Sequence, residues 1–556
     1  MRRFVKYPLL FLIILLAGGL VRFIRPGSRV MHTDEAVNAH KVGMLLETGV
    51  YRYDRSEYHG PVLYYFSLVT SRLSGHDSYA SLQESTLRFV PALFSLLTVL
   101  LLIILRRNAD WRYILTAGGL MAMAPMLVFY GRYYIHESLL TFFSLLFILA
   151  VYRYLRERRL SWVLIAGVSA GLMHATKETF VINMAAAILA LLIGVKWARD
   201  DLPARGKGWT RVPAFHWVLF LVAGTLTSML LYSSFFANPK GIADSVTTYV
   251  QYFQRAGQDD SHIHPWYYYI SLLAGPWRID GFAATDAWLL LTAAAGFAGL
   301  WIDRGKANPV GILLFLGNYS LILLLFYSAI PYKTPWNMMQ FYPGLLLLSG
   351  YAILGLFRAK WPPVLKWTLA VLVMAGGIHW GWSGMKLNFQ YCDDPGNPYV
   401  YAPTSPDVRE VAAMLDTLAM VQPEGYALPV EVVFPGDDYW PLPWYLRRFE
   451  HVGYYNRITF DAHASPVVIV SPSIEGDLVR KLYEVPPPGE RYLYTSLSGS
   501  RQELRPGVGL QVYVRMDVWD LYHYRDAAIR RRPSGIAGYP LDPGQLTQDV
   551  EQRPAR

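Results

Sequence analysis

Long apolar blocks constrain this chain more than any other feature of its sequence. The first block follows Arg2, Arg3 and Lys6 and runs to Ile24, and a helix of that length, at 1.5 Å per residue, crosses about 30 Å of hydrocarbon. A cleaved signal peptide is the competing interpretation, but the block is long, lacks a clear small-x-small cleavage site and precedes many more spans. Ten further candidate spans bring the total to eleven: 87–105, 113–130, 137–152, 160–176, 179–195, 214–236, 285–302, 309–330, 337–357 and 363–382.

The charge distribution assigns a topology to these spans. Residues 1–384 carry 34 Lys and Arg against 19 Asp and Glu, whereas the remainder carries 17 against 22. With the N-terminus inside, twenty cations lie at the inner ends of the spans, and the short outer connections 131–136, 174–178 and 331–336 carry one each. The positive-inside rule therefore favours this orientation. Because the basic excess reports topology, no nucleic-acid partner is indicated.

The chain divides into a membrane part and a smaller polar part. Residues 1–384 contain the spans and two long outer loops, 25–86 and 237–283. Residues 385–525 combine β-branched runs with helix-like stretches, which predicts a small extracytoplasmic α/β domain. The tail at 526–556 is rich in Pro, Gly, Gln and charge, which is typical of disorder. The predicted fold class is a mainly α polytopic membrane protein with about 11 transmembrane helices plus this α/β domain.

Two carboxylates follow the first span at the outer membrane surface. They belong to the run Met31-His32-Thr33-Asp34-Glu35. A partly desolvated carboxylate there can accept a proton from a hydroxyl and act as a general base. The alternative, which is compatible with the first, is that Thr33 or Asp34 caps a helix over 35–48 that ends at Gly49.

The same loop continues with aromatic, acidic and basic side chains. Glu57 and His59 lie in the run Tyr51 to Pro61, and aromatic faces beside carboxylates suit a sugar. The alternative is a solvated loop whose tyrosines lie at the membrane interface.

A very short outer turn contains Arg132, His136 and Glu137. Glu137 heads the next span, so it could simply cap that helix. Ionisable groups at membrane depth are costly unless paired or facing a polar cavity, which makes all three functional candidates. A His beside a carboxylate could also bind a divalent metal, although no recognised ligand spacing is present.

Two other outer turns each present one lysine. Lys177 and Glu178 lie in one, and Tyr332 and Lys333 in the other. Together with Arg132, these lysines are the cations available to the phosphate of a lipid carrier. The alternatives are a local Lys177–Glu178 salt bridge and a snorkelling Lys333.

The first-loop His-x-Asp-Glu, the later Arg-x-x-x-His-Glu and the many spans resemble the GT-C membrane glycosyltransferases. The chain is similar, more narrowly, to the dolichyl-phosphate-mannose-protein mannosyltransferase-like group. The run Tyr58-His59-Gly60-Pro61 and the run Tyr439 to Arg447 look like its flippase-activity-associated branch. In residues 1–384 the resemblance lies in the arrangement of the spans. In residues 385–525 it lies only in the run Tyr439 to Arg447.

The resemblance implies transfer of a sugar from a polyprenyl-phosphate donor to a protein, lipid or glycan acceptor on the outer face, usually with inversion. It implies Asp34 as general base, with Glu35 beside it and Glu137 as the second-loop acid. The expected substrate-binding residues are His32, Glu57, His59, Arg132, His136, Lys177, Glu178, Tyr332 and Lys333. No Asp-x-Asp motif appears, so no cofactor is implied and a divalent metal stays open.

A non-catalytic flippase, transport or assembly component for lipid-linked glycans is the rival prediction. Such a protein would hold the glycan with the same charged groups and change no bond. A transporter is expected to carry polar pathway residues through the midplane and often paired repeats. Here the inner halves of the spans are almost wholly apolar, which favours the enzyme.

Overall fold

The computed structural model describes residues 2–55, 59–201, 212–255, 262–303, 309–497 and 502–530. Two compact units divide the chain. The helical unit comprises 1–408, 440–448 and 503–507, and the sheet unit comprises 409–439, 449–502 and 508–556. Of the predicted tail, 526–556, residues 526–530 are the end of a helix, so the disorder predicted for them is wrong, and residues from 531 onward lie outside the described residues.

The helical unit is a bundle in which each predicted span coincides with a helix or, in one case, with a bent pair of helices. Six helices are long and apolar enough to cross a membrane, seven if the bent pair is one span, and four shorter apolar helices accompany them among the described residues. The polytopic helical prediction is thereby confirmed. The helices of the spans are α1 (Arg2–Phe23), α4 (Glu84–Leu100, continued by η1, Leu101–Arg107), α5 (Trp111–Met123), α6 (Pro125–Gly131), α7 (Glu137–Glu157), α8 (Leu160–His174), α9 (Phe180–Asp201), α10 (Ala214–Tyr232), α13 (Ala287–Ile302), α14 (Val310–Ala329), α15 (Tyr342–Arg358) and α16 (Pro363–Phe389).

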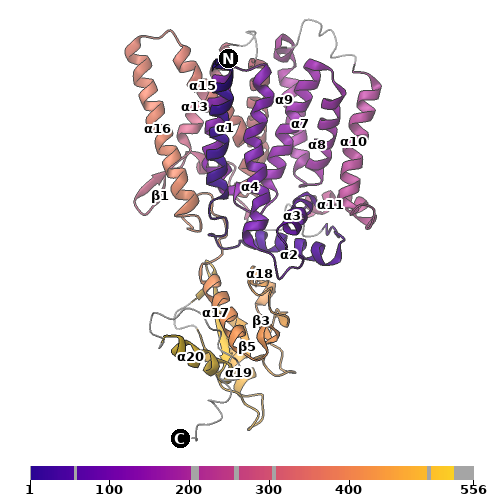
Figure 1. Ribbon diagram of the computed structural model, residues 1–556, viewed down its shortest axis with the longest axis vertical. Coiled ribbons are helices and arrows are strands. Elements are labelled where there is room, and N and C mark those ends of the chain that lie inside the picture. The colour runs from indigo at the N-terminus through magenta and orange to yellow at the C-terminus, as the bar shows by residue number, and fades with distance from the viewer. Residues whose placement is uncertain are drawn as a thin grey trace. The chain divides into compact units, whose positions relative to one another are not determined.

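The long outer loops of the sequence analysis contain short helices. In Figure 1, α2, α3 and α11 lie together at the end of the bundle opposite the N-terminus of the chain; this end is called the α2–α3 end. The helices and strands of these loops and of the connections are α2 (Thr33–Thr48), α3 (Val62–Leu73), α11 (Lys240–Arg255), α12 (Tyr268–Ala274), β1 (Trp277–Ile279), β2 (Phe282–Ala284), η3 (Pro335–Gln340) and α18 (Leu442–Tyr445).

One predicted span is not a continuous helix. The block 113–130 is divided into α5 and α6, which meet at an angle of 54°. Pro125 is the first residue of α6. Proline lacks the N–H that would continue the helix, and its ring clashes with the preceding turn, which accounts for the bend.

The N-cap of α2 differs from the predicted one. His32, rather than Thr33 or Asp34, caps the helix: its ring accepts from the Asp34 N–H, and Glu35 accepts from the His32 N–H. This is a capping box in which histidine replaces Ser or Thr. Gly49 ends the helix in the left-handed conformation at φ 72°, as predicted.

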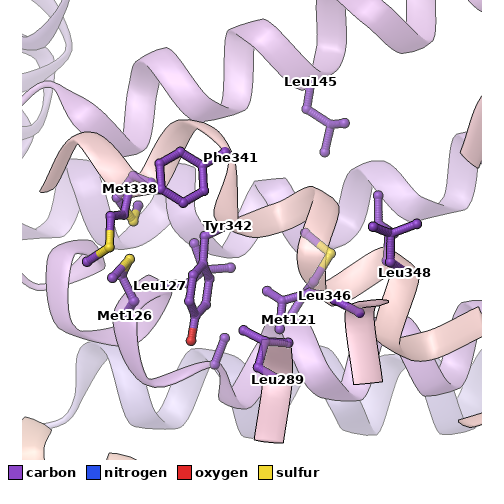
Figure 2. Close-up of a cluster of buried hydrophobic side chains, with 14 of the residues drawn as sticks. Met121, Met126, Leu127, Leu145, Leu289, Met338, Phe341, Tyr342, Leu346 and Leu348 are labelled. Atoms are coloured by element: carbon purple, nitrogen blue, oxygen red, sulfur yellow. The ribbon is translucent and has the colours of Figure 1, made fainter. Parts of the chain in front are cut away.

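The bundle packs around an apolar core that joins elements far apart in sequence. Figure 2 shows Met121 of α5, Met126 of α6, Leu289 of α13, Met338 of η3 and Tyr342 of α15 within this cluster. All five are buried. The core fixes α6 and η3, which flank the short turns at the α2–α3 end.

The sheet unit has mixed topology. Its strands follow the order β4-β3-β5-β8-β6, with β3 parallel to both β4 and β5, and β8 antiparallel to β5 and β6. The α/β character predicted for this part is confirmed, and the predicted β-branched runs form β3 and β5. The bounds are α17 (Asp407–Val421), η4 (Gly425–Ala427), β3 (Val430–Val433), η5 (Pro435–Asp437), β4 (Val452–Tyr455), β5 (Val467–Val470), η6 (Pro472–Ile474), α19 (Glu475–Tyr483), β6 (Tyr494–Ser496), β7 (Gln502–Arg505), β8 (Val508–Arg515) and α20 (Met516–Arg530).

The α13–α15 interface depends on a glycine. A Cβ on Gly296 would lie 1.9 Å from the Leu348 carbonyl oxygen, whereas one on Gly299 would meet Tyr351 at 3.6 Å. We expect Gly296→Ala to separate the helices at a cost of about 1–3 kcal/mol and to lower the thermal-unfolding midpoint of the purified protein. Gly299→Ala is the matched control and should leave the midpoint unchanged or slightly raised, because alanine favours a helix. Equal midpoints for the two variants would contradict the packing described.

Candidate functional site

Glu35 is the centre of a buried ion pair. Arg88 of α4 donates from Nε to Glu35 Oε1 at 2.7 Å and from Nη2 to Oε2 at 2.8 Å. The backbone N–H groups of Tyr134 and His32 also donate to this carboxylate, at 2.8 and 3.0 Å. Burial alone would raise the pKa of Glu35, but the charges of Arg88 and Arg29 outweigh it and lower the pKa to about 2. A carboxylate held this firmly in its charged form is a poor proton acceptor and a strong structural anchor.

Arg132 also has structural partners. Its guanidinium donates to the carbonyl of Val21, within the last turn of α1, at 3.1 Å and to that of Arg25, just beyond the helix, at 3.2 Å. The guanidinium lies over the Phe389 ring at 4.3 Å. Burial lowers the pKa of Arg132 to about 10. The structure therefore places Arg132 between helix ends, with two of its N–H groups on backbone carbonyls.

Asp34 differs from the other candidate carboxylates by its exposure. Its side chain is 47% exposed, and its Oδ1 lies 4.0 Å from the His32 Nδ1. That nitrogen accepts from the Asp34 N–H at 3.1 Å, while His32 Nε2 lies 3.0 Å from the Tyr401 carbonyl. The two hydrogen bonds place the His32 proton on Nε2 and make the ring neutral. Asp34 thus stands beside a neutral, buried histidine.

Glu137 and Lys177 form a second buried pair. The Lys177 Nζ donates to Glu137 Oε1, and both side chains are almost fully buried. Glu137 is the first residue of α7, and Lys177 lies in the turn between α8 and α9. The local Lys177–Glu178 salt bridge considered from the sequence is therefore wrong, because Glu178 faces a different partner.

Glu178 and His59 form the third pair. His59 Nδ1 lies 2.8 Å from Glu178 Oε2, and the Tyr53 hydroxyl donates to Oε1 at 2.9 Å. Glu178 is buried, whereas the His59 side chain is 34% exposed. Burial alone would raise the pKa of Glu178, but His59 and the hydrogen bonds lower it. The pair is a buried carboxylate that orients an imidazole whose ring reaches the surface.

His136 lies between these two pairs. Its Nε2 donates to the Gly60 carbonyl at 3.1 Å, and its ring centroid lies 5.2 Å from that of His59. Burial, followed by the charges of His59 and Lys177, holds the pKa of His136 well below its ordinary value, so the ring is neutral. The buried Nδ1 has no hydrogen-bond partner among the described residues. In the neutral ring this nitrogen keeps an unused acceptor lone pair.

Lys333 contacts backbone carbonyls. Its Nζ donates to the carbonyls of His264, Ile330 and Pro331 at 2.9, 2.5 and 3.4 Å. The side chain is buried, so the snorkelling alternative is wrong, and burial lowers its pKa. Tyr332 is 43% exposed, and its ring lies 4.9 Å from that of His262.

The segment between α6 and α7 joins these groups at the α2–α3 end. Glu35 binds the backbone of Tyr134, Asn38 of α2 donates to the Tyr134 carbonyl at 3.1 Å, and His136 contacts Gly60. The His32 ring lies 6.1 Å from Trp336 of η3, which follows Lys333. The structure thus brings the predicted residues of four connections to one end of the bundle. Glu57 lies outside the described residues.

The sequence analysis missed Arg88 and Tyr53. Arg88 had a usable signal, because an arginine in the first turn of an otherwise apolar span is costly unless it is paired. Tyr53 had no comparable signal, since its contact with Glu178 joins positions 125 apart in sequence.

A metal site does not emerge from the described ranges. No group of three or more His, Cys, Asp or Glu side chains within them could hold a metal ion.

The fold is that of the GT-C membrane glycosyltransferases, as the resemblance predicted. Residues 58–233 match a family model described as dolichyl-phosphate-mannose-protein mannosyltransferase. A comparison with curated proteins finds no match.

Two kinds of solved structure are similar in fold. ArnT from Cupriavidus metallidurans in the apo state has a TM-score of 0.60 at 14% identity, covering 93% of this chain and 98% of that chain. The same protein bound to undecaprenyl phosphate gives 0.59 at 15% identity, covering 92% and 97%. The oligosaccharyltransferase of Archaeoglobus fulgidus, tethered with an acceptor peptide, gives 0.51 at 13% identity, covering 89% and 73%.

The Glu35–Arg88 pair is testable by a double-mutant cycle. Arg88→Met should destabilise the protein by about 3–5 kcal/mol, because it leaves a charged carboxylate buried without its main partner. Adding Glu35→Gln should recover part of this loss, measured as the thermal-unfolding midpoint of the purified protein.

Arg72→Met on neighbouring α3 is the control, since Arg72 is exposed. A midpoint for Arg88→Met equal to that of the control would show that the pair does not hold the site together. The same conclusion would follow if the double variant lost as much stability as Arg88→Met and Glu35→Gln lose together.

Proposed function

We propose that this chain is an integral-membrane glycosyltransferase that transfers a sugar from a polyprenyl-phosphate donor to an acceptor hydroxyl. One observation carries the proposal. Of the four candidate carboxylates among the described residues, three are buried against Arg88, Lys177 or His59, and Asp34 alone is about half exposed beside a neutral histidine. An accessible carboxylate without a cationic partner can accept a proton, which is the role of a general base.

Lys177 and His59 are the proposed contacts of the donor phosphate. Both lie next to His136, and each is held in place by a buried carboxylate. Arg132 and Lys333 donate to backbone carbonyls, so we assign them to positioning the connections. The ArnT structure with undecaprenyl phosphate bound supports a lipid carrier as the donor. The polyprenyl chain of this donor would remain in the bilayer beside the helices.

The proposed reaction is a single displacement. The acceptor oxygen attacks the anomeric carbon while Asp34 takes its proton, and the bond from that carbon to the phosphate oxygen breaks. Polyprenyl phosphate leaves with the bonding electron pair, and the sugar is transferred with inverted configuration. This reaction requires the base and the leaving phosphate to lie on opposite faces of the sugar. Loss of Asp34 should lower kcat and kcat/KM equally, because the base acts only in the transition state.

The acceptor class stays broad. The oligosaccharyltransferase structure carries an acceptor peptide, which supports a peptide as one candidate beside a lipid or glycan. Glu137 and Glu178 are positioning residues in this proposal, because each acts through the cation it holds. Glu35 supports the segment that carries His136.

Asp34→Asn tests the proposal directly. The variant should transfer sugar from radiolabelled polyprenyl-phosphate sugar to membrane-extract acceptors about 10²–10⁴ times more slowly than the wild type, with donor binding retained. Asp77→Asn, an exposed aspartate in the same long loop, should transfer at the wild-type rate.

Transfer by Asp34→Asn at the wild-type rate would remove Asp34 as the base. The rival function, a flippase or assembly component, predicts a different pattern. In that case the wild type transfers no sugar yet moves lipid-linked glycan across the membrane of a proteoliposome.

We further propose that the α2–α3 end faces outward, because the cations gather at the other ends of the spans. The single cysteine, Cys392, follows α16 and is partly exposed. A membrane-impermeant maleimide should therefore label Cys392 in intact cells as fully as after lysis. Cys392→Ser is the background control, and labelling confined to lysed cells would reverse the orientation.

A further inference from the structure

The sheet unit contains a topological switch point. β4 and β5 both follow β3 in the chain, and they pair with it in parallel on opposite sides. The chain therefore leaves β3 towards one side of the sheet and returns on the other. In open α/β sheets, ligands bind outside the carboxyl ends of the strands at such a point.

The three strands end at one level. Val433 of β3 is opposite Tyr455 of β4 and Val470 of β5. The alignment continues past the strands: the Phe434 N–H donates to the Tyr455 carbonyl at 3.0 Å, and the Ser471 N–H donates to the Val433 carbonyl at 3.1 Å. The residues that follow, 434–439, 456–457 and 471–473, therefore form one edge, called the carboxyl edge.

The carboxyl edge is polar and solvent-exposed. The side chains with donors or acceptors that lie exposed along it are Asp437, Asp438, Asn456, Arg457 and Ser473. They supply carboxylate, amide, guanidinium and hydroxyl groups, which accept and donate hydrogen bonds within a short stretch.

A tyrosine ring borders this edge in a fixed position. Tyr455, the last residue of β4, is 45% exposed. Its ring lies against Gly453, where a Cβ would come within 2.6 Å of Cε2 and 2.7 Å of the hydroxyl oxygen. Glycine at 453 therefore lets the ring lie flat along an edge strand. The rings of Tyr439, on the carboxyl edge, and Tyr454, on β4, form a pair with centroids 4.8 Å apart.

We propose that the carboxyl edge of the sheet unit binds an uncharged oligosaccharide. An exposed aromatic face stacks against the apolar face of a sugar ring, and mixed carboxylate, amide and guanidinium groups match its hydroxyls. Two aspartates against one arginine disfavour a phosphate-bearing ligand. No three metal-ligating side chains come together in the described part of the unit, which disfavours a bare cation.

Binding to the full-length protein in lipid nanodiscs tests this proposal. Saturation-transfer difference NMR is recorded with mannotriose, maltotriose, cellotriose and chitotriose, each up to about 10 mM, a range suited to weak sugar binding. At least one trisaccharide should give saturable signals, and Tyr455→Ala should weaken its binding roughly tenfold or more, which corresponds to about 1.4 kcal/mol.

Two further variants separate binding from folding. Gly453→Ala keeps the tyrosine but displaces its ring, and it should also weaken binding. The double variant Asp437→Asn and Asp438→Asn changes only exposed side chains and should do the same with an unchanged unfolding midpoint. Tyr492→Ala, an equally exposed tyrosine next to β6 at the other edge of the sheet, is the matched control and should bind like the wild type.

The proposal is overturned if none of the four trisaccharides binds. It is equally overturned if Tyr455→Ala and the Asp437/Asp438 double variant bind as tightly as Tyr492→Ala. Because no donor is present, the outcome is independent of sugar transfer. Asp34→Asn, for example, should lose transfer and keep this binding.

Discussion

The buried carboxylate of Glu35 is the contact on which the α2–α3 end depends. It receives Arg88 of α4, the backbone of Tyr134 and the backbone of His32 at once. Arg88 in turn donates to the carbonyls of Pro26, Arg29 and Val30. One ion pair therefore joins the connection after α1, the start of α2, α4 and the segment before α7. Removing either charge would leave the other buried without its main partner.

The same constraint governs the rest of the site. Near a bilayer, an ionisable side chain must be paired or must face a polar space. Glu137, Glu178 and Glu35 meet this requirement through cations on other elements, which fixes the turns that carry them. Asp34 meets it by exposure. Among the described candidate carboxylates, three are thus buried and paired, and Asp34, the proposed base, is accessible.

Sequence reasoning predicted that most of the candidate residues lie at one end of the bundle, but it did not predict their pairings. The span pattern predicted that the turns at 131–136, 174–178 and 331–336 lie at one end, because helices of similar length alternate in direction. It could not predict that Lys177 pairs with Glu137 rather than with adjacent Glu178. That choice depends on the rotation of α7 against the α8–α9 turn, which no local pattern encodes. Arg88 was passed over because it lies inside an apolar block, although its cost there was itself a signal.

The sequence by itself determined the order of the apolar spans, the distribution of cations among them, the position of Gly49 at the end of α2 and the β-branched runs that form β3 and β5. These features follow from hydropathy, charge and backbone preference, which act within one segment. Only the tertiary structure decided the parallel pairing of β3 with β4 and β5, the Glu35–Arg88 pair and the flat placement of the Tyr455 ring on Gly453. Each of these depends on where a second segment or a neighbouring side chain lies in space, and contact distances of a few ångströms are set by packing, not by sequence spacing.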